Sequence, residues 1–338
     1  MSTIVDVARV ANVSIATVSR VINAPHKVRE ETRRQVHDAM TLCNYKYNAL
    51  ARGLATQRSH TIGLIIPTVT NPIFAESVRG VQDHVEASGY RVVLGNSDYS
   101  LDTEKKLIQV FREMRVDGLI ITTTDLNGPH LTELVEEKVP FVLLYSTVRR
   151  GPLSCVGIDN FKGGYRATEH LVSFGHRRIA MLAGNFSFSD KSFHRWHGYR
   201  KCLRDRGIKY DAKLLVQTTY TLESGMKAVK QLMWIKRPPT AIFCSNDFLA
   251  IGVLEGARDM GLMVPEDLSV VGFDDMPMMA YFKPGLDTIQ QPAYDMGKIG
   301  SEVLLRRIDN PDQKPVHRIL DTQLIVRQSV CSPRRKMG

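Results

Sequence analysis

Five side chains near the start of the sequence have the types and spacing that could read DNA bases. They lie on the outward face of a short predicted helix, on which Val18 and Ile22 point inward: Ile15, Ala16, Thr17, Ser19 and Arg20. An arginine there can donate two hydrogen bonds to O6 and N7 of guanine, and small apolar side chains can contact a thymine methyl group. This face therefore favours contact with the DNA major groove, although Arg20 could alternatively be a solvated surface arginine.

The element that would position these side chains is a helix-turn-helix. Ile4, Val7, Ala8 and Ala11 have helical spacing, and Thr3 and Asp6 are placed as N-cap and capping partner. The segment 12–14 breaks this pattern, a second helix is predicted from about Ile15 to Asn23, and a third from Glu30 to Cys43. Two short helices joined by a three-residue turn and braced by a third are typical of DNA-binding heads.

Charge is concentrated in the same segment. The chain has a net charge of +10. Residues 1–60 carry nine basic and four acidic side chains, so their net charge of +5 is half of the total. Arg334, Arg335 and Lys336 add three more positive charges at the end. A basic head on a nearly neutral body indicates a polyanion as partner.

Composition excludes several classes of protein. The 338 residues are 43% hydrophobic and 24% charged, which excludes a disordered tail, a collagen-like fibre and a disulfide miniprotein and allows two or three compact units. The cysteines are odd in number and form no C-x-x-C pair, so we expect buried, reduced thiols and no zinc site: Cys43, Cys155, Cys202, Cys244 and Cys331. With no apolar signal region and no run near 18 apolar residues, we expect a cytoplasmic protein that does not enter the membrane.

Residues 61–330 alternate between short β-rich runs and amphipathic stretches, which predicts strand-helix-strand crossovers on mostly parallel sheets. The predicted strands are Ile62–Pro67, Arg91–Gly95, Gly118–Thr122, Phe141–Tyr145, Ile179–Gly184, Ala241–Ser245 and Leu268–Phe273. The predicted helices lie near 72–88, 102–114, 130–138, 161–174, 193–206, 222–234, 247–260 and 293–308. Glycines follow four of these helices, at Gly89, Gly175, Gly207 and Gly261, where a left-handed cap is expected. Two such series imply two similar α/β lobes, with a crossing near 160–176.

Enzyme signals are weak. The sequence has no G-x-G-x-x-G, H-E-x-x-H or G-x-S-x-G motif, and Ser189-Asp190 occupies the place of Gly-Lys in the nearest match to a phosphate loop. His194 and His197 have no partner at metal-ligand spacing, so we interpret them as ordinary polar histidines and expect no cofactor. A carbohydrate-acting α/β enzyme and a transporter's solute-binding protein remain alternatives, but neither explains the basic head.

Ordered blocks along nearly the whole chain resemble the lactose-repressor/galactose-repressor (LacI/GalR) family of bacterial transcription regulators. They are TIVDVARVANVSIATVSRVIN (3–23), NALARGL (48–54), NPIFAE (71–76), GHRRIA (175–180), SND (245–247) and VPEDLSVVGFDD (264–275). The resemblance implies a helix-turn-helix domain over 1–47, a hinge helix and linker over 48–58, and a core over 59–330, with a basic tail at 331–338. The core would resemble periplasmic sugar-binding proteins, with one lobe of about 60–160 and 292–320 and another of 161–291 and 321–330.

By this resemblance, Leu54 would wedge between central base pairs in the minor groove, and Asn48 would cap the hinge helix. Tyr47 replaces a proline that most relatives carry at the hinge entry, so this entry is expected to be less stiff. The full set expected at DNA is Thr3, Ser14, Ile15, Ala16, Thr17, Ser19, Arg20, Asn23, Asn48, Ala51 and Leu54. We expect a homodimer, because the sequence lacks the C-terminal leucine heptads of tetrameric relatives. The expected DNA partner is a double-stranded operator with an inverted repeat, one half-site for each head.

The resemblance also implies an effector cleft, lined by Phe74, Tyr145, Arg195, Tyr220, Asn246, Asp274 and Gln291. Aspartate and asparagine suit sugar hydroxyls, and an aromatic face covers the apolar side of a sugar ring. Tyr145 stands where many sugar-binding relatives have aspartate, which leaves a sugar, a sugar acid, a nucleoside-like molecule or another small polar ligand open. Asp274 and the adjacent Asp275 could instead cap a loop or pair with lysine. The predicted function is a DNA-binding regulator, expected to repress, under allosteric control by a small polar effector.

Overall fold

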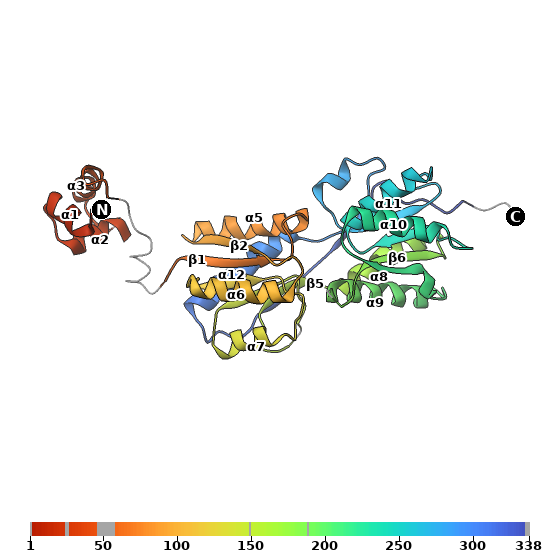
Figure 1. The fold of residues 1–338 in the computed structure, drawn as a ribbon, viewed down its shortest axis with the longest axis horizontal. Helices are drawn as coiled ribbons and strands as arrows, with labels where there is room; N and C mark the ends of the chain where they lie inside the picture. Colours follow the sequence, from red (N-terminus) through yellow and green to blue (C-terminus); the bar gives the residue numbers. More distant parts are fainter. Residues whose placement is uncertain (1, 24–26, 46–57, 149, 188, 335–338) are drawn as a thin grey trace. The chain divides into compact units, whose positions relative to one another are not determined.

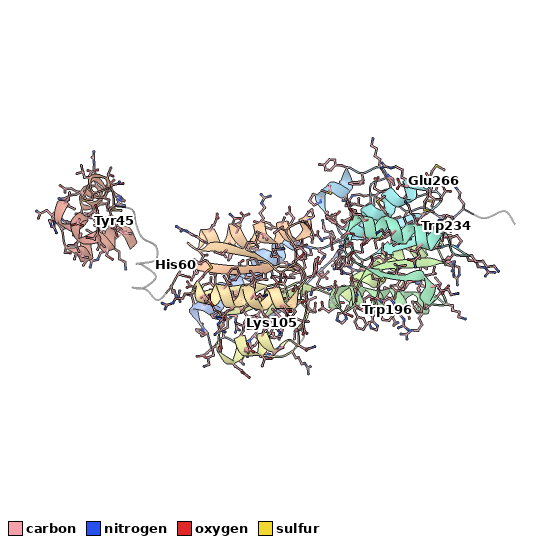
Figure 2. The ribbon with its side chains drawn as sticks, viewed as in Figure 1. Tyr45, His60, Lys105, Trp196, Trp234 and Glu266 are labelled. Carbon is pink, nitrogen blue, oxygen red and sulfur yellow. The ribbon has the colours of Figure 1, made fainter. Side chains whose placement is uncertain are left out.

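The computed structural model describes residues 2–23, 27–45, 58–148, 150–187 and 189–334. The chain divides into two units, Met1–Ser59 and His60–Gly338, each with its own hydrophobic core (Figure 1). Tyr45 packs against the core of the first unit, and His60 begins the second (Figure 2). The His60 ring lies 5.2 Å from that of Tyr90.

The first unit contains the three predicted helices, α1 (Ile4–Val10), α2 (Ile15–Asn23) and α3 (Glu30–Leu42). The predicted capping box is confirmed, since Thr3 Oγ1 accepts from the Asp6 amide and the Asp6 carboxylate accepts from the Thr3 amide. The apolar faces of all three helices meet in one small core, made of Val7, Ala8, Ala11, Val18, Val21, Val36 and Ala39.

In the second unit, the first sheet has the strand order β11-β5-β4-β3-β1-β2, and its neighbouring strands are parallel. Helices α5 and α12 pack on one another, and residues of α6 and α7 share a separate core with the sheet. Because both faces are covered, strands such as 61–66 are continuous apolar runs. The strands are β1 (Thr61–Ile66), β2 (Arg91–Asn96), β3 (Gly118–Ile121), β4 (Phe141–Leu144), β5 (Cys155–Ile158) and β11 (His317–Leu320). The helices are α5 (Pro72–Ala87), α6 (Leu101–Glu113), α7 (Pro129–Glu136) and α12 (Ala293–Asp309).

The second sheet has the order β12-β10-β9-β8-β6-β7 and is parallel except for the pair β10 and β12. Helices α8 and α9 pack as one pair, and α10 and α11 as another, on opposite faces of this sheet (Figure 1). The strands are β6 (Ile179–Gly184), β7 (Leu215–Thr218), β8 (Ala241–Cys244), β9 (Ser269–Asp274), β10 (Asp287–Gln290) and β12 (Gln323–Ile325). The helices are α8 (Asn160–Ser173), α9 (Asp190–Asp205), α10 (Leu222–Met233) and α11 (Asp247–Asp259), with short 3-10 turns η2 (Ala212–Leu214) and η3 (Pro277–Ala280).

The chain passes between the two sheets three times. It leaves the first sheet after β5, returns between β10 and α12, and crosses again between β11 and β12. We call the two halves lobe 1 and lobe 2, after the first and second sheet. Since both sheets are mostly parallel, the loops at the carboxyl ends of their strands are where polar side chains can gather.

The sequence does not predict five short strands that occur in the described residues: β5, β7, β10, β11 and β12. Three of them lie at sheet edges, and none has more than four residues. The equally short strands β3, β4 and β8 are unbroken apolar runs and are predicted, whereas β7, β10, β11 and β12 contain polar residues that interrupt such a run. The four predicted glycine caps are confirmed by positive φ angles of 63° to 94°. Three cysteines are buried as expected, but Cys43 and Cys331 are partly exposed. Cys43 follows the last turn of α3, and Cys331 lies in the C-terminal segment. In the part of the chain that the structure describes, no helix is both long and apolar enough to cross a membrane.

Candidate functional site

The predicted DNA-reading face is the exposed side of α2. Ser14 begins this helix, because its Oγ accepts a hydrogen bond from the Thr17 amide at 3.1 Å. Ile15 is 47% exposed, and Ala16 and Arg20 are also exposed, whereas Thr17 and Ser19 are half-buried. Val18 is fully buried on the other side and ties the helix to the small core. The face thus presents one long cation and small apolar groups to solvent.

Of the remaining residues predicted to contact DNA, the structure describes Thr3 in full and Asn23 in part. Thr3 is an exposed N-cap whose hydroxyl also donates to Asp6 Oδ2 at 2.8 Å. Asn23 ends α2, and its side chain lies outside what the structure describes. Asn48, Ala51 and Leu54, together with Tyr47, lie outside the described residues altogether.

All seven residues predicted for the effector cleft line a single cavity in the second unit. Its empty volume is about 590 Å³ with the open mouth included. The lining comes from both lobes, and it gathers residues separated by more than 200 positions in the sequence. Five of the seven lie at or after the carboxyl ends of strands or cap helices: Tyr145 after β4, Tyr220 before α10, Asn246 as N-cap of α11, Asp274 at the end of β9 and Gln291 after β10. The other two lie within helices near their N-termini, Phe74 in the first turn of α5 and Arg195 in the second turn of α9.

Arg195 and Asp274 form the charged centre of this cavity, with 3.8 Å between Arg195 Nη1 and Asp274 Oδ1. The Arg195 guanidinium lies over the Phe273 ring, 3.6 Å from its centroid. It also donates from Nε to Asn160 Oδ1 at 2.8 Å and from Nη1 to the Ser245 carbonyl. Burial lowers the pKa of Arg195, and burial raises the pKa of Asp274 to about 6 although Arg195 and Gln291 oppose that shift.

Two glycines allow Arg195 to reach these partners. A Cβ atom at Gly164 would lie 2.1 Å from the Arg195 carbonyl oxygen, and one at Gly198 would lie 2.1 Å from that of Phe161. Helices α8 and α9 can therefore approach closely only because both positions lack a side chain. This close approach sets Asn160, in the first turn of α8, beside Arg195.

Two amides next to this centre have atoms left for a ligand. Gln291 Nε2 donates to Asp274 Oδ1 at 2.6 Å, while its Oε1 is buried and has no hydrogen-bond partner in the described structure. Asn246 Oδ1 accepts from the Leu249 amide at 3.0 Å, so its NH₂ group is the part that can serve a ligand. Unpaired buried polar atoms are costly, so such an atom at a cavity wall favours a hydroxyl-bearing occupant.

Aromatic side chains form the walls. Tyr145, at a φ of 58°, packs edge-on against Phe74 with ring centroids 5.2 Å apart, and its hydroxyl donates to the Ile73 carbonyl. Tyr220 is fixed by hydrogen bonds between its hydroxyl and Ser189 and Ser192. A Cβ atom at Gly184 would collide with the Tyr220 ring, which explains glycine at the end of β6. Burial raises the pKa of both tyrosines, so their hydroxyls stay neutral at neutral pH.

The two adjacent aspartates separate. Asp274 faces the cavity, but Asp275 accepts from Arg327 Nη2 at 2.7 Å and from Gln290 Nε2 at 2.9 Å. Pairing with a basic side chain, one of the alternatives from the sequence, thus holds for Asp275, with arginine in place of lysine. The histidines on α9 are consistent with ordinary polar residues, since His194 is exposed and His197 packs edge-on against Phe193 with ring centroids 4.5 Å apart.

Several residues of the cavity escape the sequence prediction. They include Tyr99, whose ring lies 5.6 Å from that of Tyr220. Thr122, Thr123, Asn160 and Lys191 also line the cavity. Each follows the carboxyl end of a strand or begins the next helix, so a systematic search of those positions would have found them.

Comparison with known proteins adds two family matches. Residues 3–48 match the family described as bacterial regulatory proteins, lacI family, and residues 168–330 match a periplasmic binding protein-like domain. Catabolite control protein A of Priestia megaterium is 36% identical over 304 residues, which cover 90% of this chain and 92% of that protein.

Two solved structures are similar over nearly the whole chain. A lac repressor dimer bound to operator and the anti-inducer ONPF has a TM-score of 0.87 and 29% identity, covering 98% of this chain and 99% of its own. A complex of the transcriptional regulator CelR with cellobiose has a TM-score of 0.74 and 31% identity, covering 97% of this chain and 100% of its own.

Proposed function

The chain belongs to the lacI family of bacterial regulatory proteins, and from this premise we propose that a sugar or sugar acid bound in its cavity controls how tightly it holds an operator. It is a DNA-binding transcription regulator and not an enzyme. The observation that carries the effector proposal is the buried group of Arg195, Asp274 and Gln291 at the cavity wall.

The DNA part of the proposal rests on α2. Ile15, Ala16 and Arg20 contact base edges in the major groove, and Thr17 and Ser19 contact the flanking backbone or bases. Thr3, Ser14 and Asn23 lie at the ends of the two helices, where phosphate contacts are common. Asn48, Ala51 and Leu54 remain predictions of a hinge helix in the minor groove. Repression follows if such binding blocks transcription. A DNA partner supports a location in the cytoplasm.

We propose a homodimer on an inverted repeat. Large apolar side chains are exposed on lobe 2, at Leu222 in the first turn of α10 and at Met278 and Tyr281 around η3, where Tyr281 is 86% exposed. A second copy would cover such groups, and the two heads would then occupy successive half-sites. The domain division of the sequence prediction is retained: head 1–47, hinge and linker 48–58, core 59–330 and tail 331–338.

The effector part rests on hydrogen-bond chemistry. Asp274 accepts hydroxyl donors, Gln291 Oε1 accepts one more, and the Asn246 NH₂ group donates. The rings of Phe74, Tyr145 and Tyr220 cover apolar parts of the ligand. This combination supports a polyhydroxylated molecule more than a purely apolar one.

Control of DNA binding requires that the ligand prefer one of two states of the core. Only a difference in affinity between those states can change operator affinity, and a coupling of about 1–3 kcal/mol is usual. The lobes can supply two states because the cavity draws residues from both of them.

A two-step experiment tests the proposal. The full chain is first screened by thermal shift against sugars, sugar acids and nucleosides, because a ligand of the folded state raises the melting temperature. Its binding to promoter fragments is then measured with and without each hit, over a series of salt concentrations. We expect a sugar-class hit that changes operator affinity. A nucleoside as the only hit, or a sugar hit without any effect on DNA, would contradict the effector proposal.

A further inference from the structure

Two cations and one carboxylate line the cavity. The cations are Lys191 and Arg195, both on α9, and the carboxylate is Asp274. Their charges are not equally available to a ligand, because each group has different partners. The balance between them decides whether an occupant should be neutral or charged.

Arg195 is largely satisfied by the protein. Its guanidinium is held by Asn160, by the Ser245 carbonyl and by the Phe273 ring, and Asp274 lies 3.8 Å away. Asp274 is in turn bound by Gln291. The two opposite charges therefore compensate one another inside the cavity.

Lys191 differs because its carboxylate partner does not line the cavity. Its Nζ donates to Asp190 Oδ1 at 2.8 Å and to the Thr123 carbonyl at 3.2 Å. An ammonium group has three N–H donors, so one remains after these two bonds. The Asp190 side chain is 29% exposed, and solvent weakens its hold on the ammonium. Lys191 itself is 18% exposed and belongs to the cavity lining.

A second observation lies in the strand-end loop that Lys191 touches. Thr122, next to Thr123, lines the cavity, and its buried hydroxyl has no hydrogen-bond partner in the described part of the chain. A hydroxyl can donate to a carboxylate oxygen, as an ammonium can. One ligand carboxylate could therefore use both groups. The helices α5, α8, α9 and α11 also begin at lining residues or directly beside them, and helix N-termini favour negative charge.

We infer that Lys191 makes the cavity selective for a sugar acid, whose carboxylate it would bind together with the Thr122 hydroxyl. The hydroxyls of the same ligand then meet Asp274, Gln291 and Asn246. This inference rests on the proposed function, because it names the class of sugar derivative that the same cavity takes. Lys191, on α9 of lobe 2, also donates to the carbonyl of Thr123, which follows β3 of lobe 1. A ligand carboxylate bound at this point would therefore contact both lobes.

The test compares acids with neutral analogues of the same carbon skeleton. The pairs are D-gluconate with D-glucitol, D-galactonate with D-galactitol, and D-glucuronate with D-glucose. Affinities are measured by calorimetry on the full chain and on the variants Lys191→Met and Lys191→Arg. The control is Lys230→Met, which removes a lysine on α10 that pairs with Asp259 and is absent from the cavity lining. Methionine keeps the length of the lysine stem, so folding should be preserved, and melting curves check this.

We expect at least one acid to bind about tenfold or more tighter than its neutral partner. Lys191→Met should remove that preference, while Lys191→Arg and Lys230→Met should keep it. A neutral sugar that binds as tightly as its acid, or a preference that survives in Lys191→Met, would overturn this inference and leave the proposed function standing. Failure of every acid and neutral probe to bind would instead contradict the sugar-class effector itself, and this inference with it.

Discussion

The two binding regions of this protein are built in opposite ways. The DNA-reading face is a single nine-residue helix, α2, whose side chains lie next to one another in the sequence and project into solvent. The cavity of the core gathers side chains from Phe74 to Gln291, on both lobes, and buries most of them. A local surface can change one contact at a time, whereas the cavity depends on the packing of many elements.

This difference predicts where substitutions should act. Loss of a side chain on α2 removes an exposed contact and leaves the small core of Val7, Val18 and Val36 intact. Loss of a cavity side chain also leaves buried partners unsatisfied, which costs more than the contact itself. The following experiments test this contrast, from the largest expected effect to the smallest.

Arg195→Ala should have the largest effect. It leaves Asp274 and Asn160 without their buried partner, so effector affinity should fall by about 3 kcal/mol or more, roughly a hundredfold. Operator binding of the effector-free protein should be unchanged. Dose-response curves of operator binding provide the measurement, with Arg204→Ala, on the exposed face of the same helix, as the matched control. A normal dose response in Arg195→Ala would mean that this arginine does not hold the effector.

The acidity of Asp274 predicts a pH dependence of stability. Its pKa of about 6 in the folded chain exceeds the ordinary 3.8, so between these values the folded state keeps a proton that the unfolded state has lost. The free energy of unfolding should therefore fall as pH rises from about 4 to about 6, by an amount on the order of 2–3 kcal/mol, and level off above about 7.

Urea unfolding of the wild type and of Asp274→Asn at several pH values checks this prediction. The variant keeps the size of the side chain and removes its titration. The stability difference between the two proteins therefore reports Asp274 together with the buried Asp247, whose pKa the Asp274 charge helps to raise. If that difference stayed constant between pH 4 and pH 7, the carboxyl would not be buried in the way described.

Arg20→Ala tests the exposed region. Operator affinity should fall by about 1–3 kcal/mol, and the preference for one base pair should relax. Binding assays on the operator and on single-base variants measure both effects. Arg206→Ala makes the same change of net charge at the C-cap of α9, where Arg206 pairs with Glu169, and should leave affinity nearly unchanged. Equal loss on every sequence, without a change of preference, would assign Arg20 to phosphate.

Asn246→Ser sharpens the contrast inside the cavity. Serine is also a good N-cap, so α11 should begin as before, but the NH₂ donor is removed. We expect effector affinity to fall by about 1 kcal/mol, roughly fivefold, with little change in the free energy of unfolding. Asn246→Ala should lose both the cap and the donor. A similar effector affinity in wild type and Asn246→Ser would show that the NH₂ group does not reach the ligand.

The elements of the head and most of the core could be predicted because their signals are local. The Thr3 and Asp6 capping box, the glycines that end four helices and the long amphipathic stretches all act within a few residues. Short strands such as β10 and β12 could not, because pairing with distant strands stabilises them and polar residues interrupt their apolar runs of three or four residues.

The cavity shows the same division. Its seven expected members follow from the resemblance in residue type and position, and they do line one cavity. Their individual states do not follow from it. Asp274 and Asp275 are neighbours of the same type, yet one faces the cavity and the other is held by Arg327. Lys191 was indistinguishable in the sequence from a surface lysine.

By itself the sequence determined the helix-turn-helix, the alternation of strands and helices, and the membership of the family, since these depend on neighbouring residues and ordered motifs. Only the tertiary structure decided which polar atoms are paired and which are left for a ligand. The close contact of α8 and α9 at Gly164 and Gly198 brings Arg195 to Asn160, and Gln291 reaches Asp274 because β10 lies beside β9. Hydrogen bonding acts over about 3 Å, so it depends on where distant segments meet.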